Sequence, residues 1–377
     1  MDFSKTDYGD VKRLNRNLVY RCIYNMGSQS KQDIASTLRL SQPTVDKNVA
    51  ELIDDGLVIT TGMFASTGGR KAQAIEADKK ARYSIGLDIT RNHLSIVIID
   101  LGCSIVHFKR YEIQFENSES YFENLGRLVR EAVKKENISP KKVLGVGIAL
   151  PAIITSDHAS VSYGNYIGFT GGKISQFEEY IEFPCVLLND ANAGGFAETW
   201  HRGKQKNTLY ISLNNSVGGS ILIGGNNLNG ENRRAGEVGH LTVRPDGPLC
   251  YCGKCGCLDA LCNASILANR TNGNLAAFFE TLSNDAPDTE NTIIWERYLD
   301  DLSIAINSLR MVLDADILLG GYVGTFMDEH IDALRKRVAE RNTFEHDANY
   351  LTLCTFRYET TAVGAALYYV NKFIKAV

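Results

Sequence analysis

The sequence contains no long apolar run. No stretch approaches the roughly 18 consecutive apolar residues from which a membrane-spanning helix is built. The first twenty residues, MDFSKTDYGDVKRLNRNLVY, also lack the apolar stretch and the small-residue cleavage site of a secretory leader. These two absences predict a cytoplasmic protein without a membrane partner.

The chain also has no excess of positive charge. It carries 40 Lys and Arg residues against 44 Asp and Glu residues, so its net charge is -4. That balance argues against a protein whose whole surface is covered by nucleic acid, but it allows a small DNA-binding segment on an acidic body. The length of 377 residues predicts two or three domains.

The N-terminal segment predicts three short helices. Apolar residues recur at helical spacing over residues 11–26, and Gly27 ends that pattern. Ser30 and Ser41 each stand where a helix cap is expected, and Pro43 occupies a first turn, where its missing N–H costs little. Three helices with a tight connection between the second and the third indicate a helix-turn-helix.

Two β-like runs follow these helices and flank a basic, glycine-rich tip, GGRK. They predict a wing, so we expect residues 1–80 to form a winged helix-turn-helix DNA-binding domain. A small helical bundle without that role, or a head that contacts another protein, are the alternatives. The candidate DNA-contacting residues are Gln42, Thr44 and Lys47 on the third helix and Arg70 and Lys71 on the wing.

The sequence pattern changes at Tyr83. Alternating apolar runs such as YSIGLDIT and HLSIVIIDLG indicate strands, and strands followed by helices occur twice before the end of the chain. We therefore expect residues 81–377 to form an α/β body with two lobes and a cleft between them.

The stretch HLTVRPDGPLCYCGKCGC, residues 240–257, places four cysteines close together after a histidine. Thiolate and imidazole groups are preferred zinc ligands, and the glycines between them allow the backbone to wrap around a small ion. A redox pair, Cys252 with Cys255, is an alternative that lacks the strand-then-helix context of such sites. Buried, unliganded thiols are the other. The pattern favours a structural zinc site.

The segment GEVGHLTVRPDGPLCYCGKCGCLDAL resembles the signature of the ROK family of repressors and sugar kinases. That signature runs G-E-x-G-H, then C-x-C-G-x-x-G-C, then an acidic residue two positions later. The N-terminal helices with the GGRK wing resemble the repressor branch, and LNDANAGGFAE resembles the sugar-site strand. The resemblance covers nearly the whole chain. It implies a two-lobed actin/hexokinase-like sugar-kinase fold preceded by a winged helix-turn-helix.

The resemblance also implies specific site residues. The implied zinc ligands are His240, Cys250, Cys252 and Cys257, with Cys255 at a variable position of the pattern. Sugar recognition needs fixed carboxylates and amides on the floor of a cleft. The implied sugar-binding residues are Asn165, Asn189, Asp190, Glu237, His240 and Asp259. Asp259 stands where the family usually has Glu, and Asn189 with Asp190 could alternatively cap a helix.

Two loops that bind ATP phosphates in the family's kinases are altered here. The D-x-G-G-T turn after the first strand has become LDITRNH, which keeps only Asp88 of that pattern. The second loop, roughly G-T-G-x-G in the family, is NNSVG at residues 214–218. Side chains at these positions would crowd a phosphate that glycines would admit. The sequence thus favours a sensor over an enzyme.

The resulting hypothesis is a transcriptional repressor that binds operator DNA as a homodimer or homotetramer. A sugar or sugar phosphate between the lobes would shift its conformation and change the spacing of its heads. The alternative is an active sugar kinase that transfers phosphate from ATP to a hexose or N-acetylhexosamine. In that case Asp190 is the catalytic base.

Overall fold

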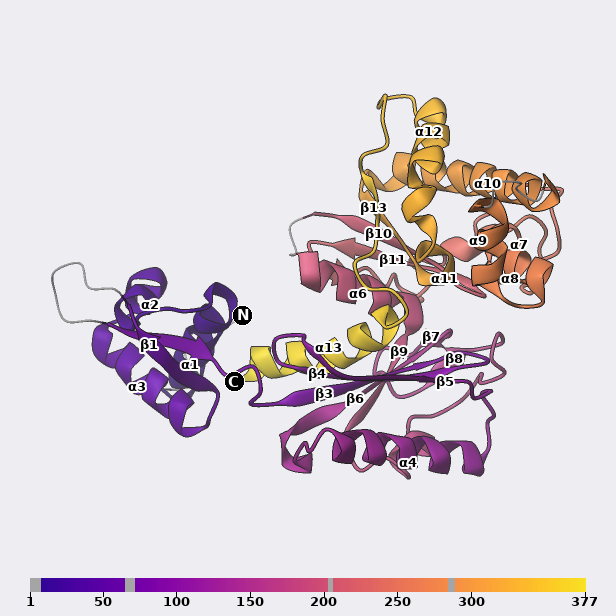
Figure 1. Cartoon of the computed structure of the whole chain (residues 1–377). Coiled ribbons are helices and arrows are strands. Elements are labelled where there is room, and N and C mark those ends of the chain that lie inside the picture. Colours follow the sequence, from indigo (N-terminus) through magenta and orange to yellow (C-terminus); the bar gives the residue numbers. More distant parts are fainter. Residues whose placement is uncertain (1–7, 65–71, 203–205, 284–288) are drawn as a thin grey trace.

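The computed structural model describes residues 8–64, 72–202, 206–283 and 289–377 (Figure 1). Within these ranges, no helix is both long enough and apolar enough to cross a lipid bilayer. The chain begins with a small head and continues into two larger lobes. The elements of the head are α1 (Tyr8–Met26), α2 (Lys31–Leu38), α3 (Gln42–Asp54), β1 (Val58–Met63) and β2 (Gln73–Ala77).

The second and third helices of the head begin directly after the predicted caps, whereas α1 begins at Tyr8, three residues before the predicted start. The Ser30 side chain accepts a hydrogen bond from the backbone N–H of Asp33, whose carboxylate in turn accepts from the N–H of Ser30. The Ser41 side chain accepts from the backbone N–H of Thr44 and so caps α3, without a reciprocal carboxylate contact. Gly27 follows α1 with a left-handed backbone, φ 72°, which glycine adopts at little cost. β1 and β2 then pair as an antiparallel hairpin.

The first lobe is built on a mixed sheet with the strand order β5-β4-β3-β6-β9 in the described part of the chain. Helices α4 and α13 cover opposite faces of this sheet (Figure 1). Alternate residues of β3 explain the two layers: Ile85 and Leu87 pack toward α4, while Gly86 meets the backbone of α13. The bounds are β3 (Tyr83–Ile89), β4 (Leu94–Asp100), β5 (Ile105–Tyr111), α4 (Glu119–Lys135), β6 (Val143–Leu150), β7 (Ile153–Ile154), β8 (Val161–Tyr163), α5 (Ser175–Glu178), β9 (Cys185–Asn189) and α13 (Thr360–Ala376).

The second lobe repeats this plan with the strand order β12-β11-β10-β13-β14 among the described residues. Helix α6 covers one face of its sheet, and a layer that includes α10 and α12 covers the other. The bounds are α6 (Asp190–Arg202), β10 (Thr208–Leu213), β11 (Val217–Ile223), β12 (Asn226–Asn227), α7 (Leu258–Cys262), α8 (Ala264–Ala268), α9 (Leu275–Ser283), α10 (Thr289–Leu313), β13 (Asp316–Gly320), α11 (Gly321–Gly324), α12 (Ile331–Arg341) and β14 (Leu351–Leu353).

Helices α6 and α13 lie against each other between the two lobes. Their backbones approach so closely that a Cβ atom on Gly364 would lie 1.8 Å from the carbonyl oxygen of Ala193. Only glycine fits at that point of α13. This crossing fixes the start of α6, and therefore the position of Asp190, relative to both sheets.

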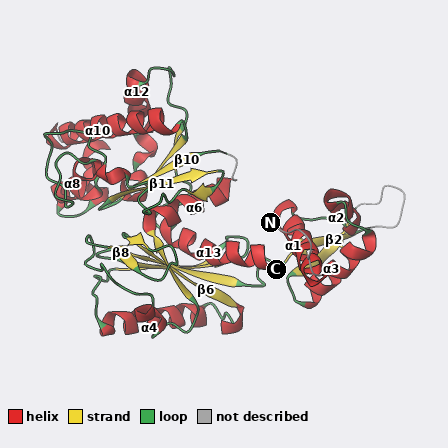
Figure 2. Cartoon of the chain, turned by 180° about the vertical axis from the view of Figure 1, so that it is seen from behind, coloured by secondary structure: helices red, strands yellow, loops and turns green. Residues whose placement is uncertain are grey.

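The head packs directly on the first lobe. Apolar side chains of α1, α3 and β2 share one core with β4 and α13. The side-chain amide of Asn17 donates to the carbonyl oxygen of Ile374 at 2.8 Å, and the Tyr24 hydroxyl donates to that of Leu101 at 2.6 Å. Both views show the C-terminal end of α13 reaching the head (Figures 1 and 2). The division into a DNA-binding domain, residues 1–80, and a sugar-kinase-like domain, residues 81–377, stays a prediction.

Candidate functional site

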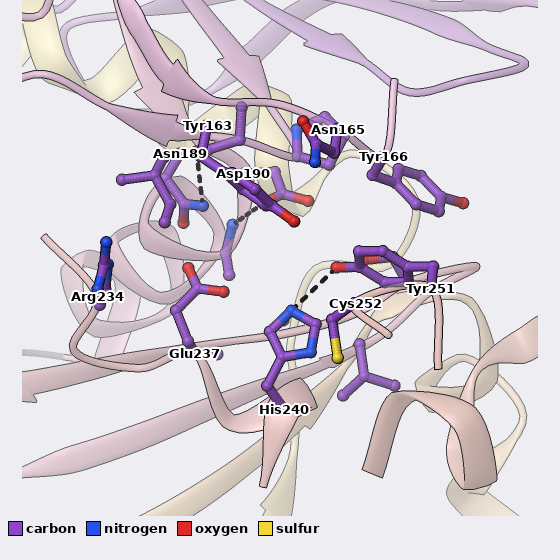
Figure 3. Close-up of a pocket in the computed structure, with 18 residues that line it drawn as sticks. Tyr163, Asn165, Tyr166, Asn189, Asp190, Arg234, Glu237, His240, Tyr251 and Cys252 are labelled. Carbon is purple, nitrogen blue, oxygen red and sulfur yellow. Dashed lines mark hydrogen bonds between the residues drawn. The ribbon is translucent and has the colours of Figure 1, made fainter. Parts of the chain in front are cut away.

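A cavity of about 380 Å³ lies in the cleft between the lobes (Figure 3). Its volume falls within the range of about 300–1,000 Å³ that is usual for small-molecule sites. Residues of both lobes line it, so a ligand there would contact both. The polar side chains that line it include Asn165, Asn189, Asp190, Arg234, Glu237 and His240.

Asn189 and Asp190 stand at the junction of β9 and α6. The Asn189 side chain accepts from the N–H of Asn192 at 2.9 Å and donates to the carbonyl oxygen of Ala152 at 3.1 Å. Asn189 therefore caps α6 and also lines the cavity, so the two interpretations of this residue are compatible. One oxygen of Asp190 accepts from the N–H of Ala191, and its carboxyl group points into the cavity.

Carboxyl groups in and near the cavity have raised pKa values. Burial raises the pKa of Asp190 to about 7, and the negative charges of Asp88 and Glu237 add to that effect. Burial also raises the pKa of Asp88 to about 7, against the opposing charge of Arg110, and that of Glu237. A carboxyl group that titrates near neutral pH can accept a proton from a hydroxyl or bind it as a hydrogen-bond partner.

The four predicted metal ligands come together beside this cavity. The ligand atoms of His240, Cys250, Cys252 and Cys257 all lie within 4.8 Å of one another. The sulfur atoms of Cys252 and Cys257 are 3.7 Å apart. A tetrahedral zinc ion with Zn–S bonds of about 2.3 Å requires sulfur atoms about 3.8 Å apart, so the spacing fits zinc. One imidazole and three cysteine sulfur atoms thus make up a donor set that could hold a metal ion such as zinc.

Cys255 lies outside this group. Its side chain is exposed, whereas Cys250 and Cys257 are buried. Cys252 lies among the candidate metal ligands, and Cys255 does not. This placement favours the metal-ligand hypothesis over a redox pair of Cys252 with Cys255. Cys262 is also outside the group, because it is buried in the core of the second lobe and donates to the carbonyl oxygen of Tyr298.

The two ring nitrogens of His240 face different surroundings. Nδ1 lies 3.9 Å from the sulfur of Cys250, on the side of the metal ligands. Nε2 lies 3.2 Å from the hydroxyl oxygen of Tyr251, on the side of the cavity (Figure 3). A metal bound at Nδ1 would fix the orientation of the ring and so the direction in which Nε2 meets a ligand.

Tyrosines that the sequence did not single out line the cavity. The rings of Tyr166, from the first lobe, and Tyr251, from the metal-ligand loop, have centroids 5.6 Å apart across the cleft. Tyr163 and Arg234 line the same cavity. Tyr251 stands between two predicted ligands, which is the one sequence feature that could have drawn attention to it. Tyr163 ends β8, while Tyr166 and Arg234 lie in loops, and none of the three stands within the metal-ligand motif.

Asp259 is placed differently from the other predicted sugar-binding residues. It is buried at the start of α7, and its carboxylate accepts a hydrogen bond from the backbone N–H of Val217. It does not line the cavity, although Val217 does. Asp259 thus supports the cavity wall from behind. The other five, Asn165, Asn189, Asp190, Glu237 and His240, all line the cavity.

The two loops that differ from the family's phosphate-binding pattern border a second, smaller hollow beside the cavity. A hollow of only about 20 Å³ remains between Thr90 to Asn92, Asn214 to Ser216, and Tyr322. That is room for about one water molecule. The Asn214 side chain accepts from the backbone N–H of Tyr322 at 2.8 Å and donates to the Ser212 hydroxyl at 2.9 Å.

The candidate DNA-contacting residues on α3 share its outer side. Gln42 and Lys47 are exposed, Thr44 is half-buried, and Val45 on the inner side is fully buried. Asp46 lies on the same outer side, where its carboxylate forms an ion pair with Lys31 at 3.1 Å. The predicted wing residues Arg70 and Lys71 lie outside the described residues.

Two mixed sheets in two lobes, a polar cavity between them and a winged helical head define a protein of the two-lobed sugar-kinase class. The chain belongs to the ROK family, whose sequence profile matches residues 84–372. The family and the two-lobed fold inferred from the sequence are thereby confirmed. One solved relative matches the fold over 97% of both chains, with a TM-score of 0.73 and 20% identity. It is a ROK family transcriptional regulator described as a homologue of the Escherichia coli MLC protein.

Curated relatives align with about two thirds of the chain. A putative xylose repressor of Caldicellulosiruptor sp. is 30% identical over 253 residues, which are 66% of this chain and 63% of that protein. The DNA-binding transcriptional dual regulator NagC of Escherichia coli is 26% identical over 260 residues, which are 68% and 64% of the two chains. These alignments thus span less than two thirds of the relatives' length. A glucokinase from Streptomyces griseus shares the fold over 76% of this chain and 98% of its own, with a TM-score of 0.62 and 20% identity.

Proposed function

We propose that this protein is a sugar-responsive transcriptional repressor. Residues 1–80 would bind operator DNA, and residues 81–377 would bind a sugar or sugar phosphate between the lobes. One observation carries the proposal: the cavity beside Asp190 has about 380 Å³, while the neighbouring hollow has about 20 Å³. A site of this shape holds a sugar without ATP. Relatives named as repressors support the same conclusion.

The cavity has the chemistry that sugar hydroxyls require. The Asp190 and Glu237 carboxyl groups and the Asn165 amide are hydrogen-bonding partners for hydroxyls. Tyr166 and Tyr251 offer aromatic faces to the apolar side of a sugar ring. Zinc, held by His240, Cys250, Cys252 and Cys257, would supply a rigid cross-link in the loop and no reaction step.

The mechanism that follows is a shift between conformations. A sugar that contacts both lobes stabilises the lobe arrangement in which both sets of contacts form. Asp190 begins α6, α6 packs along α13, and the end of α13 binds Asn17 of the head. Movement between the lobes would therefore shift the head. In a homodimer or homotetramer this alters the spacing of the two α3 helices, which must enter successive turns of the major groove.

Fluorescence anisotropy tests the proposal. The full-length protein is titrated against DNA from upstream of its own gene at fixed salt, because phosphate contacts make affinity salt-dependent. The titration is repeated with xylose, glucose, N-acetylglucosamine and their phosphates. We expect preference over random DNA and a change in affinity with one of these sugars. Equal affinity for random DNA, unaffected by every sugar, would refute the proposal.

An active sugar kinase is the second candidate, because Asp190 has a pKa near neutral pH. A base with a pKa of about 7 is well suited to take a proton from a sugar hydroxyl. Binding of ATP would then require the hollow lined by Asn214 and Tyr322 to open. Sugar-dependent turnover of ATP separates the two candidates.

A further inference from the structure

A second cavity, of about 400 Å³, lies behind the first turn of α6. Asn189 lines both cavities, but the α6 residues divide between them. Asp190 and Ala191 line the cavity already described, whereas Asn192 and Ala193 line the second one. The second cavity is therefore separate from the proposed sugar site, and we call it the rear cavity.

The crossing of α6 and α13 forms part of the wall of the rear cavity. Ala193 and Gly364, the two residues in closest backbone approach, both line it. Neither has a side chain long enough to fill the space beside the crossing. His158 of the first lobe and the loop after β12 of the second lobe complete the walls, so a ligand there would contact both lobes.

Amide groups dominate the lining of the rear cavity, and no carboxylate is among the lining residues that the structure describes. Arg233 contributes a guanidinium group, and the rings of His158 and Tyr368 have centroids 5.5 Å apart. Such a surface favours a negatively charged ligand, although the whole chain has a net charge of -4. The lining asparagines are Asn189, Asn192, Asn226, Asn227, Asn229 and Asn371.

Two of these groups, on Asn192 and Arg233, lack a partner of a particular kind within the described part of the protein. The side-chain oxygen of Asn192 is buried and accepts no hydrogen bond. Buried polar atoms without a partner are rare in folded proteins and require an explanation. Arg233 forms no ion pair with any described residue. Asn227, in contrast, is satisfied internally, because it accepts from the Ser220 hydroxyl and donates to the carbonyl oxygen of Asn192.

The backbone explains why two successive arginines face different cavities. Arg233 has a left-handed conformation, φ 57°, which is unusual for a residue with a side chain. The chain turns there, so that Arg233 lines the rear cavity while Arg234 lines the sugar cavity. The molecule therefore contains a matched pair of arginines, equal in charge and adjacent in sequence, one for each cavity.

We propose that the rear cavity binds a small, hydroxyl-rich anion of the sugar-phosphate class. The Arg233 guanidinium pairs with the phosphate, to which its fork of N–H donors is complementary. Asn192, Asn229 and Asn371 bind the hydroxyl groups, since an amide can both donate and accept. The Tyr368 ring covers the apolar face of the molecule.

Calorimetric titration of the full-length protein with glucose 6-phosphate, glucose and inorganic phosphate tests this site. The titrations use the Asp190→Ala background, which removes the main contact in the sugar cavity. Arg233→Ala and Arg234→Ala are then added separately, with circular dichroism to check folding. We expect glucose 6-phosphate to bind, Arg233→Ala to weaken that binding at least tenfold, and Arg234→Ala to leave it unchanged.

Three results would overturn the assignment. The first is no binding of glucose 6-phosphate in the Asp190→Ala background. The second is a loss with Arg234→Ala that equals or exceeds the loss with Arg233→Ala, which would move the ligand to the sugar cavity. The third is binding of inorganic phosphate as tight as that of glucose 6-phosphate, which would indicate a non-specific anion site. None of these results depends on DNA binding, so a failure of this assignment can be told apart from a failure of the repressor proposal.

Discussion

The two halves of the interlobe cleft lie side by side, share Asp190 and differ in what fills them. On one side, carboxyl groups, amides and tyrosines surround open space. On the other side, the Asn214 side chain is hydrogen-bonded to the backbone N–H of Tyr322 and to the Ser212 hydroxyl. Room for about one water molecule remains there. We propose that this kinase-like fold keeps a hydroxyl-binding half open, while side chains of the protein itself close the half that would hold phosphates.

The metal-ligand loop supports the open half, and its loss should have the largest effect. We expect Cys252→Ala to abolish zinc binding and to lower Tm by on the order of 10 °C, because the ion cross-links His240 to the loop. Zinc content and a melting curve measure this. Cys255→Ser is the matched control, since that exposed cysteine lies outside the ligand group. A similar effect of both variants, or of neither, would contradict the structural role.

Loss of the Asp190 carboxyl group should have the next largest effect, on sugar affinity. Asp190→Ala should weaken sugar binding about 100-fold, because a charged hydrogen-bond partner contributes roughly 1.5–3 kcal/mol. DNA affinity without sugar should stay unchanged. Asn215→Ala, in the closed half, is the control and should leave sugar affinity as it is. Equal losses in the two variants would show that both halves contact the sugar. Calorimetry and DNA anisotropy provide the measurements.

The Tyr251 hydroxyl occupies the Nε2 atom of His240 when no sugar is bound, and a variant of Tyr251 tests the effect of that contact on sugar affinity. Its hydroxyl lies 3.2 Å from Nε2 of His240, so a sugar that uses Nε2 must displace it. Tyr251→Phe removes this competitor and keeps the ring against Tyr166. We expect sugar to bind about fivefold more tightly, which corresponds to one neutral hydrogen bond of about 1 kcal/mol. Weaker binding would instead mean that the hydroxyl contacts the sugar directly.

The raised pKa of Asp190 gives the smallest effect, one on stability. Its pKa is about 7 in the folded protein and 3.8 for an unburied aspartate. Between these values the folded state binds more protons than the unfolded state, so the free energy of unfolding falls as pH rises from about 4 to about 7. Asp190→Asn removes this penalty. At pH 8 we expect the free energy of unfolding of the variant to exceed that of the wild type by on the order of 1 kcal/mol.

Urea unfolding at pH 5 and pH 8 measures that difference. The advantage of Asp190→Asn should shrink at pH 5, where more of the wild-type carboxyl groups are protonated. The same variant should lose the sugar response, which would make Asp190 a residue whose function costs stability. A variant that is less stable than the wild type at both pH values would contradict the assigned cause.

The parts of the site that the sequence predicted are those fixed by short spacing. His240 and the three candidate ligand cysteines lie within 18 residues, so the resemblance of this one segment to the family signature was enough to name them. Helix caps such as Ser30 and Ser41 are equally local. Asn189 and Asp190 were identified because a strand end and a helix start meet there.

The features that the sequence did not predict depend on distant segments. Tyr166 and Tyr251 are 85 positions apart in the sequence and meet only because the lobes face each other. The bond from Asn17 to Ile374 joins the two ends of the chain. Asp259 was expected in the cavity, but the orientation of α7 turns it toward Val217, and no local pattern encodes that orientation.

The most direct test of the proposal that the cleft binds a sugar without ATP is sugar-dependent turnover of ATP by the purified protein. The protein is incubated with magnesium, ATP and each sugar that changes its DNA affinity, and release of ADP is followed. The account predicts sugar binding without ADP release above the sugar-free rate, because the hollow beside Asn214 admits no triphosphate. ADP release that requires the sugar and is abolished by Asp190→Asn would contradict it and establish the kinase.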